Sequence, residues 1–253
     1  MRRAFLAAVA LLAVSSSAAS ASPVQQGKGL FGQYCVACHG ANGEGITKPR
    51  PIGFAQNRDV TKQGGVGPSL QGVGALAADF YVRTGYMPLK HVGQQPRRSR
   101  VDFSEPQIRA LVAYVASLGH GPAIPTPHPE RGSLSAGMQL FTDRCSGCHQ
   151  VVAQGGVVTG ALPPALENAT DVQIAEAVRI GPYVMPTFSK KAISDRQLDS
   201  IIRYVDYTKH PDNAGGWSLG DIGPVPEGLV AWFIAAIALV GLCIAIGKRL
   251  KHA

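Results

Sequence analysis

A motif that occurs twice is the feature that most constrains how this chain can fold. Residues 27–39 and 137–149 share one pattern: a glycine, then Leu-Phe, then Cys-x-x-Cys-His, with the two copies 110 residues apart. Recurrence of one pattern followed by further shared landmarks indicates a duplicated structural unit. The chain is therefore expected to contain two similar domains rather than one large domain.

Further landmarks follow each motif in the same order. Both copies continue with Pro-x-Leu, Val-Arg-x-Gly, Met-Pro and Ser-x-x-Gln. In the first and second copy these landmarks begin at Pro68 and Pro164, Val82 and Val178, Met87 and Met185, and Ser104 and Ser194. The last landmark is typical of a helix N-terminus closed by a capping box, and apolar residues follow it at helical spacing. Because runs of alternating polarity are scarce, we predict that both copies are all-α.

The composition narrows the possible function classes. Hydrophobic residues make up 45% of the chain and charged residues 16%, which excludes a disordered polyelectrolyte. The net charge is +8, but residues 22–120 carry +6 while residues 121–227 carry −3. A nucleic-acid-binding chain is expected to present one continuous basic face, so we predict no nucleic-acid partner. Two oppositely charged halves suggest two different docking partners.

Both ends of the chain point to a membrane. Residues 1–21 combine two arginines, an apolar run and a small-x-small site, which predicts a signal peptide cleaved after Ala21; an uncleaved anchor is the alternative. Residues 228–247 carry no charge and are long enough to span the hydrocarbon layer. Three basic residues follow within residues 248–253, which predicts a cytoplasmic C-terminus at the plasma membrane and an extracytoplasmic location for the two repeated domains.

These landmarks predict the organisation of the whole chain. A Pro-rich stretch between the two copies is expected to form a stiff spacer. The predicted segments are the signal peptide (1–21), the first domain (22–120), the Pro-rich linker (121–131), the second domain (132–208), a second linker (209–227), one transmembrane helix (228–247) and a cytoplasmic tail (248–253).

The repeated Cys-x-x-Cys-His motif is the attachment sequence for c-type haem. Each cysteine forms a thioether with a haem vinyl group, and the adjacent histidine is delivered to the iron. The residues concerned are Cys35, Cys38 and His39, and Cys145, Cys148 and His149. A zinc site would need two cysteine pairs much closer together, and a redox dithiol would not require the histidine in both copies. We predict two covalently bound haems.

The sixth iron ligand decides whether a haem carries electrons or performs chemistry. Met87 and Met185 occupy equivalent positions in the two copies and are each followed by proline, so we predict that both are axial ligands. His91 is a possible competitor in the first copy, although the second copy has no counterpart. The carbonyls of Pro68 and Pro164 are candidate acceptors for the second ring N–H of the haem histidines, the alternative being ordinary turn prolines.

The first copy carries additional loop sequence, which is predicted to mark a docking surface. Eight extra residues lie between Met87 and Tyr114, and the loop contains four cations, Lys90, Arg97, Arg98 and Arg100. Most charged runs are simply solvated surface. This run follows the predicted methionine ligand closely, however, so it could steer an acidic redox partner.

Each copy resembles a class I cytochrome c domain, over most of residues 24–119 and 132–208. The whole chain resembles the dihaem cytochrome c subunit of the actinobacterial cytochrome bcc complex, a menaquinol–cytochrome c reductase that associates with a haem–copper oxidase. The resemblance implies haem attachment and iron ligation by the cysteines, histidines and methionines named above. It also implies partners: cytochrome b, a Rieske iron–sulfur protein, a haem–copper terminal oxidase and the lipid membrane.

The resemblance further implies an electron-transfer subunit with no substrate site of its own. The first haem would accept an electron from the Rieske protein, and the second haem would pass it to the oxidase. The sequence departs from the family pattern at Leu162-Pro163-Pro164, where two prolines compete to accept from the haem histidine. Three rivals remain: a membrane-tethered dihaem carrier for another dehydrogenase or oxidase, a dihaem peroxidase, and an inert membrane anchor.

Overall fold

A computed structural model describes residues 21–47, 66–90, 94, 96–211 and 224–251. Within these ranges the chain is helical, and its extended contacts are limited to two isolated bridges, between Ile46 and Gly67 and between Val158 and Ala161. The prediction of an all-α fold is therefore confirmed. Residues 1–20 of the predicted signal peptide and His91 lie outside the described residues, as do residues 212–223 of the second linker.

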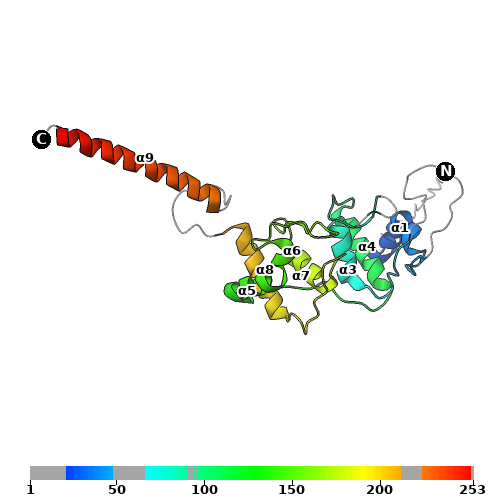
Figure 1. Cartoon of the computed structure of the whole chain (residues 1–253). Helices are drawn as coiled ribbons and strands as arrows, with labels where there is room; N and C mark the ends of the chain where they lie inside the picture. The colour runs from blue at the N-terminus through cyan, green and yellow to red at the C-terminus, as the bar shows by residue number, and fades with distance from the viewer. Residues whose placement is uncertain (1–20, 48–65, 91–93, 95, 212–223, 252–253) are drawn as a thin grey trace, which may run out of the picture. The chain divides into compact units, whose positions relative to one another are not determined.

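Within the part of the chain that the structure describes, each copy contains four α-helices in the same order. In the first copy they are α1 (Pro23–Tyr34), α2 (Val36–His39), α3 (Gly74–Arg83) and α4 (Glu105–Ser117). In the second copy they are α5 (Leu134–Arg144), α6 (Ser146–His149), α7 (Asp171–Ile180) and α8 (Asp195–Lys209). A short 3-10 helix, η1 (Pro129–Arg131), precedes the second copy, and α9 (Pro224–Lys251) follows it (Figure 1).

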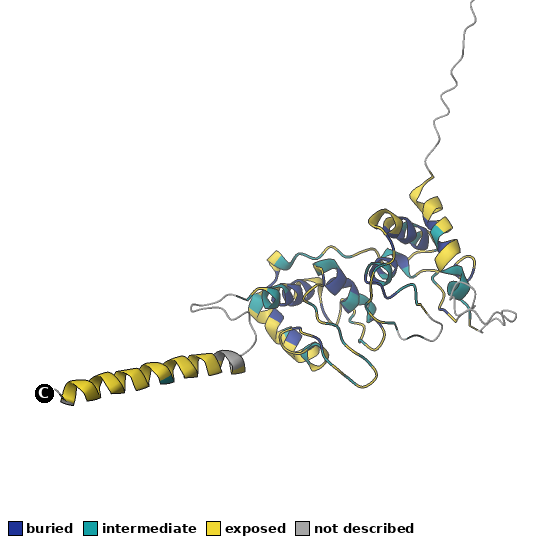
Figure 2. Cartoon of the chain, turned by 90° about the horizontal axis from the view of Figure 1, so that it is seen from above, coloured by how far each residue is buried: buried dark blue, intermediate teal, exposed yellow. Residues whose placement is uncertain are grey.

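The first and last helices of each copy pack closely against each other, and this contact explains the glycine that opens the repeated motif. A Cβ atom at Gly27 would lie 1.9 Å from the carbonyl oxygen of Ala110, and one at Gly137 would lie 1.9 Å from that of Ser200. Only a residue without a side chain allows such an approach between α1 and α4, or between α5 and α8. These crossings lie among buried residues of the two cores (Figure 2).

The serine and glutamine landmarks begin the last helix of each copy, as predicted. At Ser104 the capping box is complete, with the Ser104 N–H donating to Gln107 Oε1 over 2.8 Å. The Ser194 N–H likewise donates to Gln197 Oε1 over 2.9 Å. These bonds use N–H groups that have no partner within the helix itself, and so they fix where α4 and α8 begin.

The two copies contact each other through α3 and α7, which lie side by side (Figure 1). At this contact the Glu176 side chain is fully buried, and it faces Asp79 and Arg83 of the first copy. Leu76 N donates to the linker carbonyl of Pro122, and His128 N donates to Asp199 Oδ1 of the second copy. The Pro-rich segment is thus bound to both copies.

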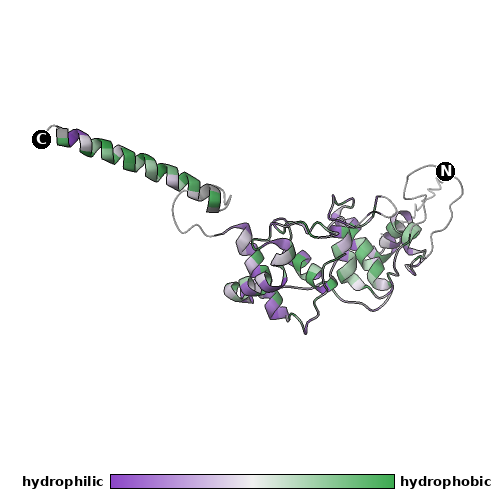
Figure 3. Cartoon of the chain, in the orientation of Figure 1, coloured by the Kyte–Doolittle hydropathy of each residue, from purple (hydrophilic) through white to green (hydrophobic). Residues whose placement is uncertain are grey.

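The last helix forms a unit of its own, within residues 210–253. Its segment Gly228–Leu250 spans 23 residues and is long and apolar enough to cross a membrane. The apolar character runs along nearly the whole helix, and polar residues appear near its C-terminal end (Figure 3). The predicted transmembrane segment, residues 228–247, falls inside this helix.

Candidate cofactor-binding sites

Each Cys-x-x-Cys-His motif forms one tight helical turn directly after the first helix of its copy. Cys35 is the C-cap residue of α1, and the His39 N–H donates to its carbonyl over 2.9 Å. The His149 N–H makes the same bond to Cys145, also over 2.9 Å. Residues at positions i, i+3 and i+4 share one face of a helical turn, so each motif presents both cysteines and the histidine to the same side.

A proline carbonyl fixes each motif histidine. His39 Nδ1 lies 2.8 Å from the carbonyl oxygen of Pro68, and His149 Nδ1 lies 3.1 Å from that of Pro164. A carbonyl oxygen can only accept, so Nδ1 carries the proton, and in the neutral ring Nε2 keeps its lone pair. Burial lowers the pKa of both histidines, although the proline carbonyls partly oppose this effect. Both rings are therefore held in the form that can bind a metal through Nε2.

The two adjacent prolines of the second copy have separate partners. The carbonyl of Pro164 accepts from His149, whereas the carbonyl of Pro163 accepts from the Gly156 N–H over 3.1 Å. Gly156 itself packs against the backbone of the motif, because a Cβ there would lie 2.8 Å from the Cys148 carbonyl oxygen. The competition between the two prolines is thus resolved in favour of Pro164.

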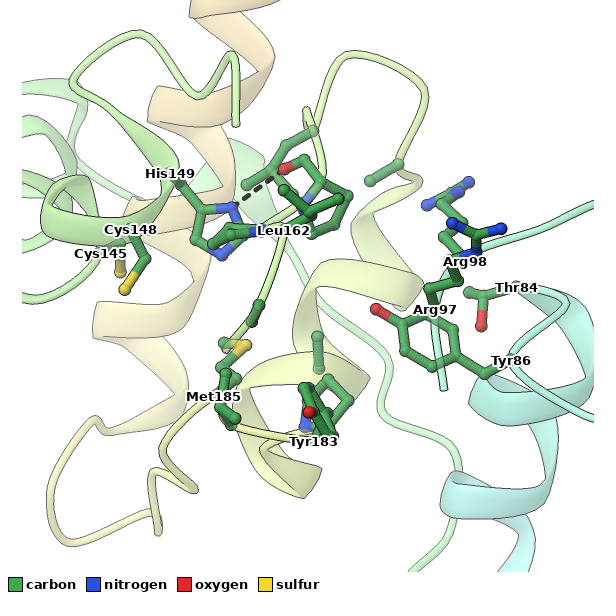
Figure 4. Close-up of a pocket in the computed structure, with 18 of the residues that line it drawn as sticks. Thr84, Tyr86, Arg97, Arg98, Cys145, Cys148, His149, Leu162, Tyr183 and Met185 are labelled. Atoms are coloured by element: carbon green, nitrogen blue, oxygen red, sulfur yellow. Dashed lines mark hydrogen bonds between the residues drawn. The ribbon is translucent and has the colours of Figure 1, made fainter. Parts of the chain in front are cut away.

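The second motif opens onto a cavity of about 840 Å³. Figure 4 shows His149 and Met185 directed into this cavity, with Cys145 and Cys148 along one side of it. Most of the remaining lining is apolar and comes from α7 and from the loops around it. The structure therefore gathers the four residues predicted for the second site around one volume.

The loop that carries Met185 is anchored by an arginine of the repeated Val-Arg-x-Gly landmark. Arg179 Nη1 donates to the carbonyls of Phe188 and Ile193, and Nη2 donates to Asp195 Oδ1 over 2.8 Å. The sequence identified this arginine only as a landmark of the duplication. Its contacts show that it ties the methionine loop to both α7 and α8.

The equivalent arginine of the first copy keeps its ion pair to the acid that begins the last helix but differs in its other partners. Arg83 forms ion pairs with Asp79, over 2.8 Å, and with Glu105 at the start of α4. Met87 follows α3, and its N–H donates to the Tyr81 carbonyl over 2.9 Å. The first copy thus keeps the link between its third and fourth helices, while its methionine segment bonds back to α3.

The first cysteine of each motif is poorly suited to thiolate chemistry. Burial is the main cause that raises the pKa of Cys35 to about 12 and that of Cys145 to about 11. Reactive dithiols and metal-binding thiolates have lowered pKa values instead. Among the described residues, no group of three or more His, Cys, Asp or Glu side chains is placed to hold a metal ion. The apolar cavity beside the motif suits a large flat cofactor attached through both cysteines.

Residues of the first copy also line the second cavity, which the sequence did not reveal. Tyr86, Arg97 and Arg98 lie across the cavity from Cys145 and Cys148 (Figure 4). Two of them belong to the basic loop interpreted above as a docking surface. Arg98 in fact bonds to the second copy, as described below, so the docking role of this loop stays a prediction.

Comparisons with known proteins agree with this geometry. Residues 24–119 match the family described as "Cytochrome c", and residues 132–205 match "Cytochrome C oxidase, cbb3-type, subunit III". Each matched segment contains one Cys-x-x-Cys-His motif, as expected for a cytochrome c domain.

Similar proteins cover nearly the whole chain. A Corynebacterium diphtheriae protein named "Cytochrome bc1 complex cytochrome c subunit" is 34% identical, covering 89% of this chain and 81% of its own length. A Mycobacterium tuberculosis protein of the same name is 36% identical over 94% of this chain and 82% of its own. The Rhodobacter capsulatus "Cbb3-type cytochrome c oxidase subunit CcoP" is 27% identical over 71% of this chain and 60% of its own.

Proposed function

Because the chain belongs to the family of cytochrome bc1 complex cytochrome c subunits, we propose that it carries single electrons from this complex to a haem–copper terminal oxidase. Family membership and the two cytochrome c domains make it an electron carrier with two covalently bound c-type haems, within an oxidoreductase complex. The proposal adds the donor, the acceptor and the order of the two haems. The donor is the Rieske iron–sulfur protein of a menaquinol-oxidising complex that also contains cytochrome b.

We assign the binding roles residue by residue. Cys35, Cys38, Cys145 and Cys148 would form the thioether bonds, and the iron ligands would be His39 and Met87 in the first domain and His149 and Met185 in the second. When bound, each haem supplies a one-electron couple. The protein's residues set its properties: the proline carbonyls orient the histidines, and a methionine thioether opposite imidazole favours the ferrous form and raises the potential. A sixth ligand from the protein also leaves no open position for peroxide.

One observation carries the proposal that the haems act in series. Tyr86 lines the second cavity, and the next residue, Met87, is the proposed ligand of the first haem. A single peptide unit therefore joins the two sites. This arrangement supports an electron path from the first haem to the second without a diffusing carrier.

The helix α9 is proposed to anchor the haem domains at the membrane. Lys248, Arg249 and Lys251 end this helix, and the positive-inside rule assigns such an end to the cytoplasm. The two haem domains would then lie on the extracytoplasmic side, after cleavage of residues 1–21. Protease protection in intact cells tests this topology.

The function is tested by purifying the tagged chain from gently solubilised membranes and recording a dithionite-reduced minus oxidised spectrum. The proposal predicts b-type and a-type haem bands that accompany the c-type bands in fixed ratio. If c-type bands appear alone, the chain does not belong to a quinol-oxidising complex joined to an oxidase. A high-spin haem signal in the resting protein would favour the peroxidase alternative.

A second function is favoured by one finding. The second domain matches a subunit of cbb3-type oxidases, and the similarity to CcoP extends over both domains. This supports a membrane-tethered dihaem carrier for another oxidase. Co-purification of oxidase subunits without cytochrome b or the Rieske iron–sulfur protein would support that reading over the first.

A further inference from the structure

The second cavity is built from both domains. Its lining includes Tyr86, Lys90, Arg97 and Arg98 from the first domain, in addition to the motif and the methionine of the second. The first domain therefore forms one wall of the site. Sequence comparison of the two copies cannot predict this wall, because the loop that supplies it lies in the part that only the first copy has.

The charged side chains that line the cavity are all positive. Lys90, Arg97 and Arg98 from the first domain, together with Arg144 from α5, are its charged members, and the described lining contains neither aspartate nor glutamate. Clustered cations without a carboxylate favour an anionic group within the cavity. A haem carries two such groups, its propionates.

The position of the arginines matches the position of the propionates. The macrocycle bears its propionates on the edge remote from the vinyl groups, and the vinyl groups bond to the motif cysteines. In Figure 4 the cysteines lie on one side of the cavity and Arg97 and Arg98 on the opposite side. The edge bearing the propionates would therefore face the wall contributed by the first domain.

Hydrogen bonds fix the loop that carries Arg97 and Arg98, and so they position these two side chains. The Ser99 N–H donates to the Thr84 carbonyl over 3.3 Å, and the Ser99 hydroxyl donates to the Gly85 carbonyl. Arg98 Nη2 reaches into the second domain and donates to the Asn168 carbonyl over 3.1 Å and to Gln173 Oε1 over 3.2 Å. A guanidinium has five N–H donors, so these two bonds leave others for a carboxylate.

We propose that Arg97 and Arg98 of the first domain bind the propionates of the second haem, so that the first domain completes the second haem's binding site. The inference rests on the proposed attachment of haem to Cys145 and Cys148. It makes the two arginines positioning residues that also set the electrostatic environment of the second iron. Cations near the haem favour the reduced form, whose net charge is lower by one.

The test is a spectroelectrochemical titration of the full chain in detergent, in a Cys35→Ala/Cys38→Ala background that leaves only the second haem. Arg97→Gln/Arg98→Gln is expected to lower the ratio of reduced to oxidised haem at a fixed electrode potential about tenfold, equivalent to about 59 mV for one electron. It should also strengthen the pH dependence of the potential, because the propionates lose the cations that keep them ionised. Replacing Arg98 by lysine instead of glutamine should restore part of the reduction potential that the double variant loses.

Arg100→Gln is the matched control, since Arg100 is exposed, belongs to the same loop and does not line the cavity. Its potential should equal that of the parent. Resonance Raman spectra give a second readout, through the bending vibrations of the propionates, which should shift in the double variant and not in the control. An unchanged potential and unchanged propionate vibrations in the double variant would overturn the inference.

Haem counting separates this inference from the proposed function. If the background variant holds one haem per chain and substituting Arg97 and Arg98 leaves the reduction potential unchanged, the inference fails while the proposed function stands. If the parent chain itself holds no covalent haem at Cys145 and Cys148, the proposed attachment fails as well. The haem content is therefore measured before the titration.

Discussion

The two haem domains share their construction but differ in what completes each site. Both use a glycine at a tight helix crossing, a motif turn after the first helix and a proline carbonyl that fixes the histidine. The second cavity, however, is closed on one side by residues of the first domain, Arg97 and Arg98 among them. Duplication thus preserved the parts that hold a cofactor, while an insertion in one copy joined the two sites.

The methionine loops show the same divergence. In the second domain Arg179 bonds to two loop carbonyls and to Asp195, so α7, the loop and α8 form one unit. In the first domain the equivalent Arg83 pairs with Asp79 and Glu105. Both arginines therefore keep the ion pair to the acid that begins the last helix, and only Arg179 also bonds to the methionine loop.

The largest expected effect comes from removing either cysteine pair. Cys35→Ala/Cys38→Ala and Cys145→Ala/Cys148→Ala should each reduce the covalent haem content from two to one per chain, because each motif attaches its own haem. A pyridine haemochrome assay measures this. Loss of both haems from either variant would show that the two sites do not load independently, and would break the comparison between them.

The helix-crossing glycines should be equally sensitive in both domains. Gly27→Ala and Gly137→Ala each place a Cβ 1.9 Å from a backbone oxygen, so each should destabilise its domain by about 3 kcal/mol or more. Thermal unfolding followed by circular dichroism measures the change. Gly29→Ala and Gly147→Ala are the controls, since a Cβ at either position meets nothing within 4 Å, and they should leave the unfolding temperature nearly unchanged.

The raised pKa of Glu176 predicts that the contact between the domains is sensitive to pH. Burial, and next the Asp79 carboxylate, raise its pKa from 4.5 to about 8, while Arg83 opposes this shift. An acid with a raised pKa stabilises the fold most below its unfolded pKa, and that stability is lost as the pH rises towards 8, by about 1.4 kcal/mol per pH unit at most.

Glu176→Gln should remove this pH dependence, because an amide does not titrate in the range. Denaturant unfolding at several pH values between 5 and 8 measures the slope. Glu167→Gln serves as the control, because Glu167 is exposed in the same domain. A slope that persists in Glu176→Gln would assign the effect to another group.

The smallest expected effect distinguishes the two repeated arginines. Arg179→Gln should destabilise the second domain by about 1–2 kcal/mol, because it removes an ion pair and two bonds to partly buried carbonyls. It should also weaken the methionine-to-iron charge-transfer band in the near infrared. Arg83→Gln should leave that band unchanged, since Arg83 bonds to α3 and α4 carboxylates; a reduced band in both variants would contradict the difference between the loops.

Much of the local architecture was predictable from the sequence. The repeat predicted two helical copies, and the Ser-x-x-Gln elements predicted where α4 and α8 begin, because capping is decided within four residues. The Cys-x-x-Cys-His spacing predicted covalent haem, since one helical turn is enough to align the three side chains. The capping box and the haem motif each involve residues within a few positions of one another, so both can be recognised in the sequence alone.

The contacts between domains could not be predicted in this way. Arg98 meets Gln173, a residue 75 positions away, only because α3 packs beside α7. Glu176 looks like an ordinary surface acid of an amphipathic helix, and its burial follows from the same packing. The spacing of the motifs holds no information on how one copy faces the other, so the shared wall of the second site required the structure.

Electron flow through the two haems in series is tested most directly by measuring quinol-driven oxygen consumption in membranes that contain either cysteine-pair variant. If electrons pass from the first haem to the second, then Cys35→Ala/Cys38→Ala and Cys145→Ala/Cys148→Ala should each abolish the flow, although each chain retains one haem. If either variant sustains substantial oxygen consumption, its missing haem is not an obligatory step, and the series arrangement is contradicted.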